Sequence, residues 1–143
     1  MIITRNEVKA DVAQKLTLAA IQYARIKKWE IAVAVCDPRG GLVSFLRTDE
    51  VVLPAIDFAI DKAYTAASLK KSTKNFFTRA NNNKSLSMGL ANRPRLMVWS
   101  GGLPFFYEDN CIGGIGVSGA QDFEDIECAK EAIISLGLSF EVD

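Results

Sequence analysis

Three charged residues, Asp37, Arg47 and Lys62, are candidates for a site, and the apolar residues near Arg47 and Lys62 motivate this hypothesis. If the helix that carries Lys62 crosses a sheet, Lys62 and Arg47 would both face a groove floored by Gly101 and Gly102. The backbone N–H groups of such a glycine pair would favour a carboxylate or an enolate. In an enzyme acting on a hydroxy or oxo acid, Lys62 would be the amine or acid, Arg47 the carboxylate clamp and Asp37 the base.

Two of these side chains also have a structural interpretation. Arg47 would form a salt bridge with Asp49 or Asp61, and Lys62 would be a solvated side chain. The burial of Lys62 separates the alternatives, because a buried Lys62 with a lowered pKa favours the enzyme and a fully solvated Lys62 excludes it.

The chain contains no histidine, the residue used most for acid–base catalysis near neutral pH and for binding zinc or haem iron. Ser-His-Asp and Cys-His catalytic arrangements are therefore excluded. The three cysteines, Cys36, Cys111 and Cys128, are far apart and form no C-x-x-C pair, so we expect reduced thiols and no metal site. The adjacent acidic residues at 49–50, 108–109 and 124–125 are expected in solvent.

The segment GGIGVSGA, residues 113–120, contains the G-x-G-x-x-G spacing of dinucleotide-binding turns. A dinucleotide site needs a buried parallel strand before the first glycine and a helix directly behind it, whereas these glycines lie within a predicted strand. Acidic residues at the start of the next helix would also repel a pyrophosphate. We therefore expect the bare backbone of Gly113, Gly114 and Gly116 to admit either a closely packed helix or a flat ligand.

A chain of 143 residues predicts a single domain, 1–143, with its own core. Its 17 basic and 17 acidic residues leave no net charge, so we expect no nucleic acid and no membrane as partners, although the balance still permits a local charged patch. No run approaches the roughly 20 apolar residues of a membrane span, and the first residues lack the apolar stretch of a signal peptide. The expected location is cytoplasmic.

Hydrophobic periodicity predicts the elements that position these residues. The capping box Thr4-Arg5-Asn6-Glu7 predicts a helix that ends near Lys28. Strands at 31–36 and 42–47 follow as a hairpin, and a second helix begins at Pro54 with a face of mostly small residues. Residues 72–95 are expected to form a mobile connection around a short helix at 74–79.

The C-terminal half predicts three further strands, at 96–99, 103–108 and 111–118, and a helix at 123–136 with Asp122 as its N-cap. The segment LSFEV at 138–142 is compatible with one more strand. Because hairpins connect the strands, the sheet is antiparallel and the fold class is α+β, with helices packed on the sheet.

Three segments together carry a resemblance to a known family: IAVAVCDPRGGLVSFLRTD (31–49), AIDFAIDKAYTAASLKKST (55–73) and SGGLPFFYEDNCIGGIGVSGAQDFEDIECA (100–129). In their order and spacing the chain resembles the GlcG/HbpS family, which includes the C-terminal domain of PduO-type cobalamin adenosyltransferases. The resemblance covers nearly all of residues 4–136. It implies a profilin-like layered fold, with a five-stranded antiparallel sheet flanked by helices, and homo-oligomers that are dimers or larger.

The family pattern also falls on candidate site residues. It includes Asp37, Gly40, Gly113 and Gly119, and the ligand-binding residues that the resemblance implies are Arg47, Lys62, Thr65, Gly101, Gly102, Pro104, Gly116 and Ser118. In the characterised members of the family that bind haem, the resemblance implies that a histidine is the axial ligand of the haem iron. In this chain an iron ligand would have to be Cys36, Cys111, Cys128, Met88, Met97 or a tyrosine, and we therefore assign no certain cofactor.

Two functions follow from the residues and the resemblance. The first is an oligomeric protein that binds a small organic or tetrapyrrole (haem-like) ligand as an accessory factor of a catabolic pathway. The second is a small cofactor-independent enzyme that uses Lys62, Arg47 and Asp37 on a hydroxy or oxo acid. The absence of histidine favours the first.

Overall fold

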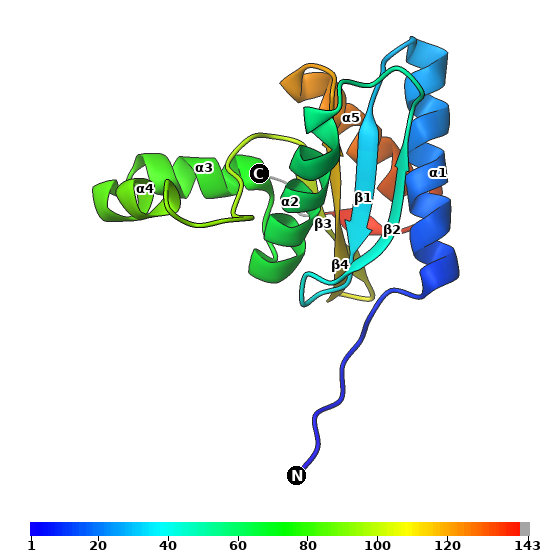
Figure 1. Cartoon of the computed structure of the whole chain (residues 1–143). Coiled ribbons are helices and arrows are strands. Elements are labelled where there is room, and N and C mark those ends of the chain that lie inside the picture. The colour runs from blue at the N-terminus through cyan, green and yellow to red at the C-terminus, as the bar shows by residue number, and fades with distance from the viewer. Residues whose placement is uncertain (141–143) are drawn as a thin grey trace.

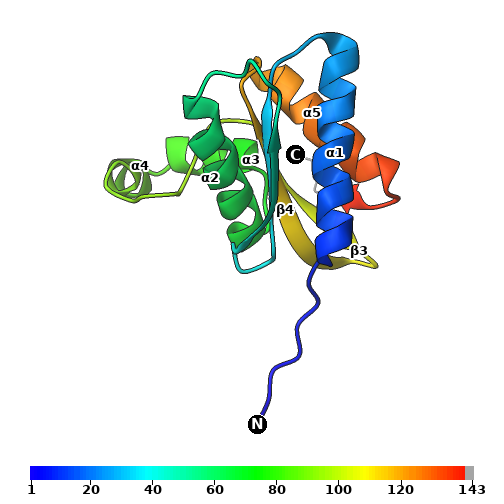
Figure 2. The ribbon, with the colours of Figure 1, turned by 45° about the vertical axis from the view of Figure 1, so that its right-hand side comes forward.

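A five-stranded antiparallel sheet in the order β2-β1-β4-β3-β5 is the middle layer of the computed structural model, which describes residues 1–140. Two helices cover one face and a third helix covers the other (Figure 2). This arrangement confirms the α+β class and the five-stranded antiparallel sheet. The strands are β1 (Ala32–Cys36), β2 (Leu42–Arg47), β3 (Gly102–Tyr107), β4 (Asn110–Ser118) and β5 (Ser139–Phe140).

Three helices pack on the sheet and form the body of the molecule with it, whereas two helices project away from it. α1 (Ala10–Lys27) and α5 (Asp122–Ser135) lie together on one face of the sheet, and α2 (Pro54–Leu69) lies on the other. α3 (Thr73–Asn81) and α4 (Lys84–Leu90) extend away from the sheet on the α2 side (Figure 1). We call residues 73–99, which contain these two helices and the segment that returns to the sheet, the arm. None of the helices described in residues 1–140 is long and apolar enough to cross a membrane.

The strand β1 has a different core on each of its two faces. Val33 and Val35 face large apolar residues of the α1 and α5 side, while Ala32, Ala34 and Cys36 face the small residues of α2. Successive side chains of a strand point to opposite faces, so the alternation of alanine and valine assigns one face to each layer. Every residue of β1 is buried as a result.

The glycines of β4 let α2 lie directly on the sheet. A Cβ atom added to Gly114 would stand 2.6 Å from the backbone nitrogen of Ala67, and one added to Gly116 would overlap the backbone of Ala59 and Ala63. Neither position can hold a larger residue without moving α2. Of the two interpretations of these glycines, the closely packed helix is therefore the one observed.

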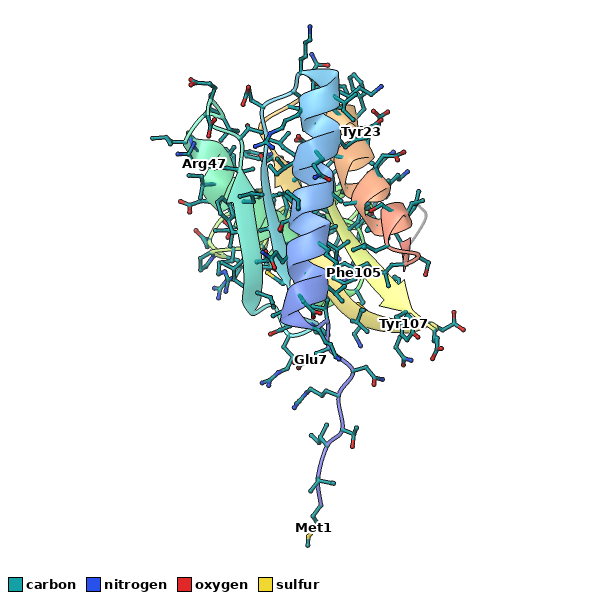
Figure 3. All side chains as sticks on the ribbon, turned by 90° about the vertical axis from the view of Figure 1, so that its right-hand side faces the viewer. Met1, Glu7, Tyr23, Arg47, Phe105 and Tyr107 are labelled. Carbon is teal, nitrogen blue, oxygen red and sulfur yellow. The ribbon has the colours of Figure 1, made fainter. Side chains whose placement is uncertain are left out.

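The first helix begins later than its predicted capping box. Its N-cap is Lys9, which makes no side-chain cap, so the prediction from Thr4 and Glu7 was wrong. The backbone N–H of Val8 donates to the carbonyl of Ile112 in β4, and the Val8 side chain is buried. This docking holds the preceding residues extended, and they leave the body as the segment between Glu7 and Met1 in Figure 3.

The predicted strand at 96–99 is wrong, because this segment attaches to α2 and not to the sheet. The Thr65 hydroxyl donates to the carbonyl of Arg95 and accepts the N–H of Met97, both at 3.0 Å. The fifth strand is β5, which lies within the segment 138–142 that was only compatible with a strand; residues 141 and 142 lie outside the described residues.

Two helix starts also differ from prediction. α4 was expected to be part of a connection, yet the Asn83 side chain caps it by accepting the N–H of Leu86. The N-cap of α5 is Gln121 and not Asp122, because Gln121 and Glu124 form a reciprocal capping box.

Candidate functional site

Lys62 reaches from α2 into the sheet and forms an ion pair that is closed to solvent. Its Nζ donates to the carbonyl of Val117 at 2.8 Å and to Oδ2 of Asp125 at 3.3 Å, and both side chains are only 3% exposed. Asp125 also accepts the backbone N–H of Ala120 at 3.1 Å. The solvated interpretation of Lys62 is therefore wrong, as is the expectation that Asp125 lies in solvent.

Burial controls the protonation of this pair. It lowers the pKa of Lys62, an effect that the Asp125 carboxylate partly offsets. It raises the pKa of Asp125 to about 6, although the Lys62 ammonium and the Ala120 N–H act in the opposite direction. The two charges are each costly inside the protein, and each is retained because the other is present.

A pocket of about 250 Å³ lies over the ion pair, and we call it the Lys62 pocket. Its outer wall contains Phe58 and Trp99, whose rings meet edge to face with centroids 4.9 Å apart. The other residues that line it are Val52, Ala55, Lys62, Ser118, Gly119, Ala120, Asp122 and Asp125. The pocket therefore combines an aromatic wall with a charged floor.

Gly101 is required for this floor. Its φ of +124° is a conformation that other residues rarely adopt, and an added Cβ would stand 3.0 Å from Nζ of Lys62. Of the predicted ligand-binding residues, the structure thus brings Lys62, Gly101 and Ser118 together.

Four other predicted ligand-binding residues have packing roles. Thr65 holds the arm to α2, Gly102 and Gly116 contact the backbone of α2, and Pro104 is buried in β3 opposite Gly114. The Thr73 hydroxyl accepts the N–H of Gly102 at 3.0 Å. These residues shape the region around the Lys62 pocket without lining it.

Arg47 and Asp37 lie at opposite ends of the β1–β2 hairpin. Asp37 closes the turn by accepting the N–H groups of Arg39 and Gly41, and Arg47 ends β2 at the outer edge of the sheet (Figure 3). The Arg47 guanidinium donates to the carbonyls of Thr48 and Asp49 and forms no ion pair within residues 1–140. The structure does not bring Arg47, Asp37 and Lys62 together.

Trp99 also borders a second depression, of about 350 Å³, which we call the arm groove. It lies between α3, α4 and the returning segment, and its residues are mostly apolar: Phe77, Ala80, Asn81, Ser87, Leu90, Ala91, Leu96, Met97, Val98 and Trp99. The arm contains five of the 17 cationic residues and none of the 17 acidic ones. The sequence analysis selected neither Trp99 nor Phe77, although this one-sided charge was a usable signal.

The sulfur atoms differ in their access to a ligand. Cys36 and Cys128 are fully buried, and burial raises the pKa of each thiol to about 12. Met97 lines the arm groove, and Met88 is exposed on α4. Across residues 1–140, no three Cys, Asp or Glu side chains gather where they could hold a metal ion.

The chain is similar to proteins of one family over most of its length. Residues 8–134 match the family model for haem degrading protein HbpS-like. A 15.0 kDa protein encoded between dhaT and dhaS in Citrobacter freundii is 31% identical over 134 residues, which are 87% of this chain and 94% of that protein. Protein GlcG of Escherichia coli K12 is 29% identical over 115 residues, 80% of this chain and 84% of GlcG.

Solved structures have the same fold. Klebsiella pneumoniae ORFY superposes with a TM-score of 0.87 at 26% identity and covers 95% of this chain and 94% of its own. A haem complex of PduOC superposes with a TM-score of 0.85 over 95% of this chain and 99% of its own, at 21% identity. At that identity the PduOC comparison concerns the fold alone.

Proposed function

The chain belongs to the HbpS-like family, and from this premise we propose that it is a non-catalytic, homo-oligomeric accessory protein that binds a flat tetrapyrrole-class ligand in the arm groove. The observation that carries the proposal is the groove itself, an apolar surface with exposed aromatic side chains on a segment whose charges are all positive. A tetrapyrrole that carries carboxylates matches both properties.

The apolar part of the proposal rests on Phe77 and Trp99. They are 50% and 52% exposed, and both line the arm groove. Aromatic side chains with that much free surface can stack on a planar ligand and be covered by it. A volume of about 350 Å³ is at the low end of the range for small-molecule sites, so the groove would hold one edge of a tetrapyrrole.

The charged part rests on the cations of the arm. Lys74, Arg79, Lys84, Arg93 and Arg95 are the five, and no acidic residue lies among them to compensate their charge. Arg95 is partly engaged, because it stacks on Tyr64 at 3.8 Å and lies 3.9 Å from Asp61. The remaining cations are available to the carboxylates of a ligand.

A histidine-ligated haem does not fit this chain. There is no histidine, and the Cys36 and Cys128 thiols are enclosed in the core. The Met97 thioether is the soft donor that lines the arm groove. We therefore propose that the protein recognises the macrocycle through its shape and its charge. The proposed function does not include degradation of haem.

The enzyme hypothesis has one observation in its favour, the buried Lys62 with its lowered pKa. Its other two residues lie elsewhere, since Asp37 and Arg47 are at opposite ends of their hairpin. Lys62 also already donates to Val117 and Asp125. The binding function accounts for more of the surface and is the one we retain.

Homo-oligomerisation is supported by apolar residues outside the body. Met1, Ile2 and Ile3 are largely exposed on the extended N-terminal segment, and α4 has no buried residue. Contact with a second copy would cover such surface. Light scattering behind a sizing column should give a mass of at least two chains, and a monomer at micromolar concentration would contradict this part.

Titration with haemin, followed by the Soret band, tests the ligand. We expect a saturable one-to-one shift that Phe77→Ala weakens about tenfold through lost stacking and burial. Phe123→Ala is the matched control, because Phe123 is also an exposed phenylalanine on a helix but lies outside the groove. Alanine substitutions of Cys36, Cys111 and Cys128 should leave the shift unchanged.

Metal-free protoporphyrin IX separates shape from iron ligation. We expect its affinity to lie within about threefold of that of haemin, because recognition through shape and charge needs no strong axial ligand. Absence of a saturable shift with haemin, or equal weakening by Phe77→Ala and Phe123→Ala, would overturn the proposed site.

A further inference from the structure

We propose that the Lys62 pocket is a second binding site, which shares Trp99 with the arm groove, and that it takes a small organic cation: an ammonium group on an apolar body. The sequence had predicted a carboxylate or enolate at Lys62. The exposed Asp122 carboxylate at the rim and the aromatic wall of the folded pocket favour a positively charged ligand instead.

The charge of the lining is negative above the pKa of about 6 of Asp125, where the floor carries no net charge. Lys62 and Asp125 sum to zero, both when they form an ion pair and when the proton has moved between them. Asp122 is exposed at the rim, close enough to act electrostatically on both members of the pair, and forms no ion pair within residues 1–140. One uncompensated carboxylate therefore faces the pocket, and it attracts a cation and repels an anion.

The aromatic wall strengthens this preference. Phe58 and Trp99 meet at 86°, so they form a corner and not a flat stack. The face of an aromatic ring carries negative electrostatic potential, and tryptophan is the most effective partner for a cation. Trp99 is half exposed and has surface available for such a contact.

Ser118 supplies the hydrogen-bonding group inside the pocket. It is only 5% exposed, and it lines the pocket. A serine hydroxyl can both donate and accept a hydrogen bond, so Ser118 can bind a polar group that enters the pocket. An ammonium ion can donate to Ser118 and Asp122 at once, while the alkyl or aryl body contacts Val52 and Ala55.

The size of the site limits the ligand. A volume of about 250 Å³ corresponds to roughly eight water molecules, which suits a monocyclic or short aliphatic amine and not a tetrapyrrole. Two of the three N–H donors of Lys62 are already engaged within the floor, because Nζ donates to Val117 and Asp125. The ligand is therefore expected to bind above the ion pair without breaking it.

The test compares three probes of one shape and different charge: benzylammonium, benzyl alcohol and benzoate. Fluorescence of Trp99, read in a Trp29→Phe background, reports binding beside Trp99, and the Asp122 and Ser118 variants assign that binding to the Lys62 pocket and not to the arm groove. We expect saturable binding in the order benzylammonium, benzyl alcohol, benzoate. Asp122→Asn should weaken benzylammonium two- to fivefold and leave benzyl alcohol unchanged. Ser118→Ala should weaken both probes up to about tenfold.

Asp11→Asn is the matched control for Asp122→Asn, because Asp11 is likewise an exposed acid in the first turn of a helix. It should leave benzylammonium binding unchanged. Benzoate binding as tightly as benzylammonium would overturn the proposal, as would equal effects of Asp122→Asn and Asp11→Asn or the lack of any effect of Ser118→Ala. Circular dichroism of each variant confirms that it is folded.

Discussion

The body and the arm of this protein differ in how many of their residues are buried. In the body, β1 is buried on both faces and α2 lies against the glycines of β4. In the arm, α3 buries three residues and α4 buries none. Segments with few buried contacts open more easily than the core, and recognition surfaces are drawn from them. Because the helices of the arm bury few residues, we expect the arm to contribute less to stability than the body does.

The largest expected difference comes from removing one apolar side chain in each region. Phe105 in β3 is fully buried, so Phe105→Ala should lower the free energy of unfolding by about 3–5 kcal/mol. Met88 in α4 is 66% exposed, and Met88→Ala should change it by less than about 0.5 kcal/mol. Urea denaturation measures both values. Similar losses for the two variants would mean that the arm is part of the core.

The next effect concerns the two acids beside Lys62. Asp125→Ala leaves a buried ammonium without its partner and should cost about 3 kcal/mol, the lower end of the range for a broken buried pair, because the pocket admits water. Asp122→Ala removes an exposed acid and should stay within about 0.5 kcal/mol. If thermal denaturation shows the same loss of stability for both substitutions, Lys62 and Asp125 do not form the buried ion pair described above.

Replacing glycine by alanine should change the free energy of unfolding by a smaller amount, with opposite signs in the body and in the arm. Gly116→Ala forces a Cβ into the backbone of α2 and should destabilise by about 1–3 kcal/mol. Gly89 lies in α4 with no atom within 4 Å of an added Cβ, so Gly89→Ala should stabilise by about 0.5–1 kcal/mol. Chemical denaturation of both variants would show whether the sign changes between body and arm.

The last expected effect is a pH dependence, for which only an upper limit follows from the pKa shift. Because burial raises the pKa of Asp125 from 3.8 to about 6, the folded state keeps a proton that the unfolded state releases in this window. The contribution of Asp125 to stability is therefore present at low pH and is lost as the pH rises from about 4 to 6. The unfolding free energy of the wild type, taken relative to Asp125→Asn, should fall over that range by no more than about 3 kcal/mol. A relative increase would show that attraction to Lys62 outweighs burial.

The body was largely predictable because its patterns are local. Alternating apolar strands around Pro38 and Gly40 predicted the β1–β2 hairpin, and the small residues behind Pro54 predicted a helix that packs closely. The segment at 96–99 has the same apolar character as a strand. It became part of the arm because Thr65, 30 and 32 positions earlier, forms hydrogen bonds with the backbone of Arg95 and Met97.

The candidate site was predictable only in part. Lys62 was selected correctly as a residue of interest, but its partner Asp125 is 63 positions away and stands in an acidic segment typical of a solvated helix start. No local pattern distinguishes the one acid that turns inward from its neighbours Asp122 and Glu124. That distinction depends on the path of α2 across β4, which the glycines permit but do not specify.

The alternation in β1 has a consequence for how the sheet finds its alignment. In most strands a slip of one residue is prevented because it would expose apolar side chains and bury polar ones. Both faces of β1 are apolar, so polarity gives no such protection here. A slip would instead press valines against α2 and leave alanines facing α1, and it would therefore be rejected by volume alone. In this sheet, side-chain size performs the task that polarity performs elsewhere.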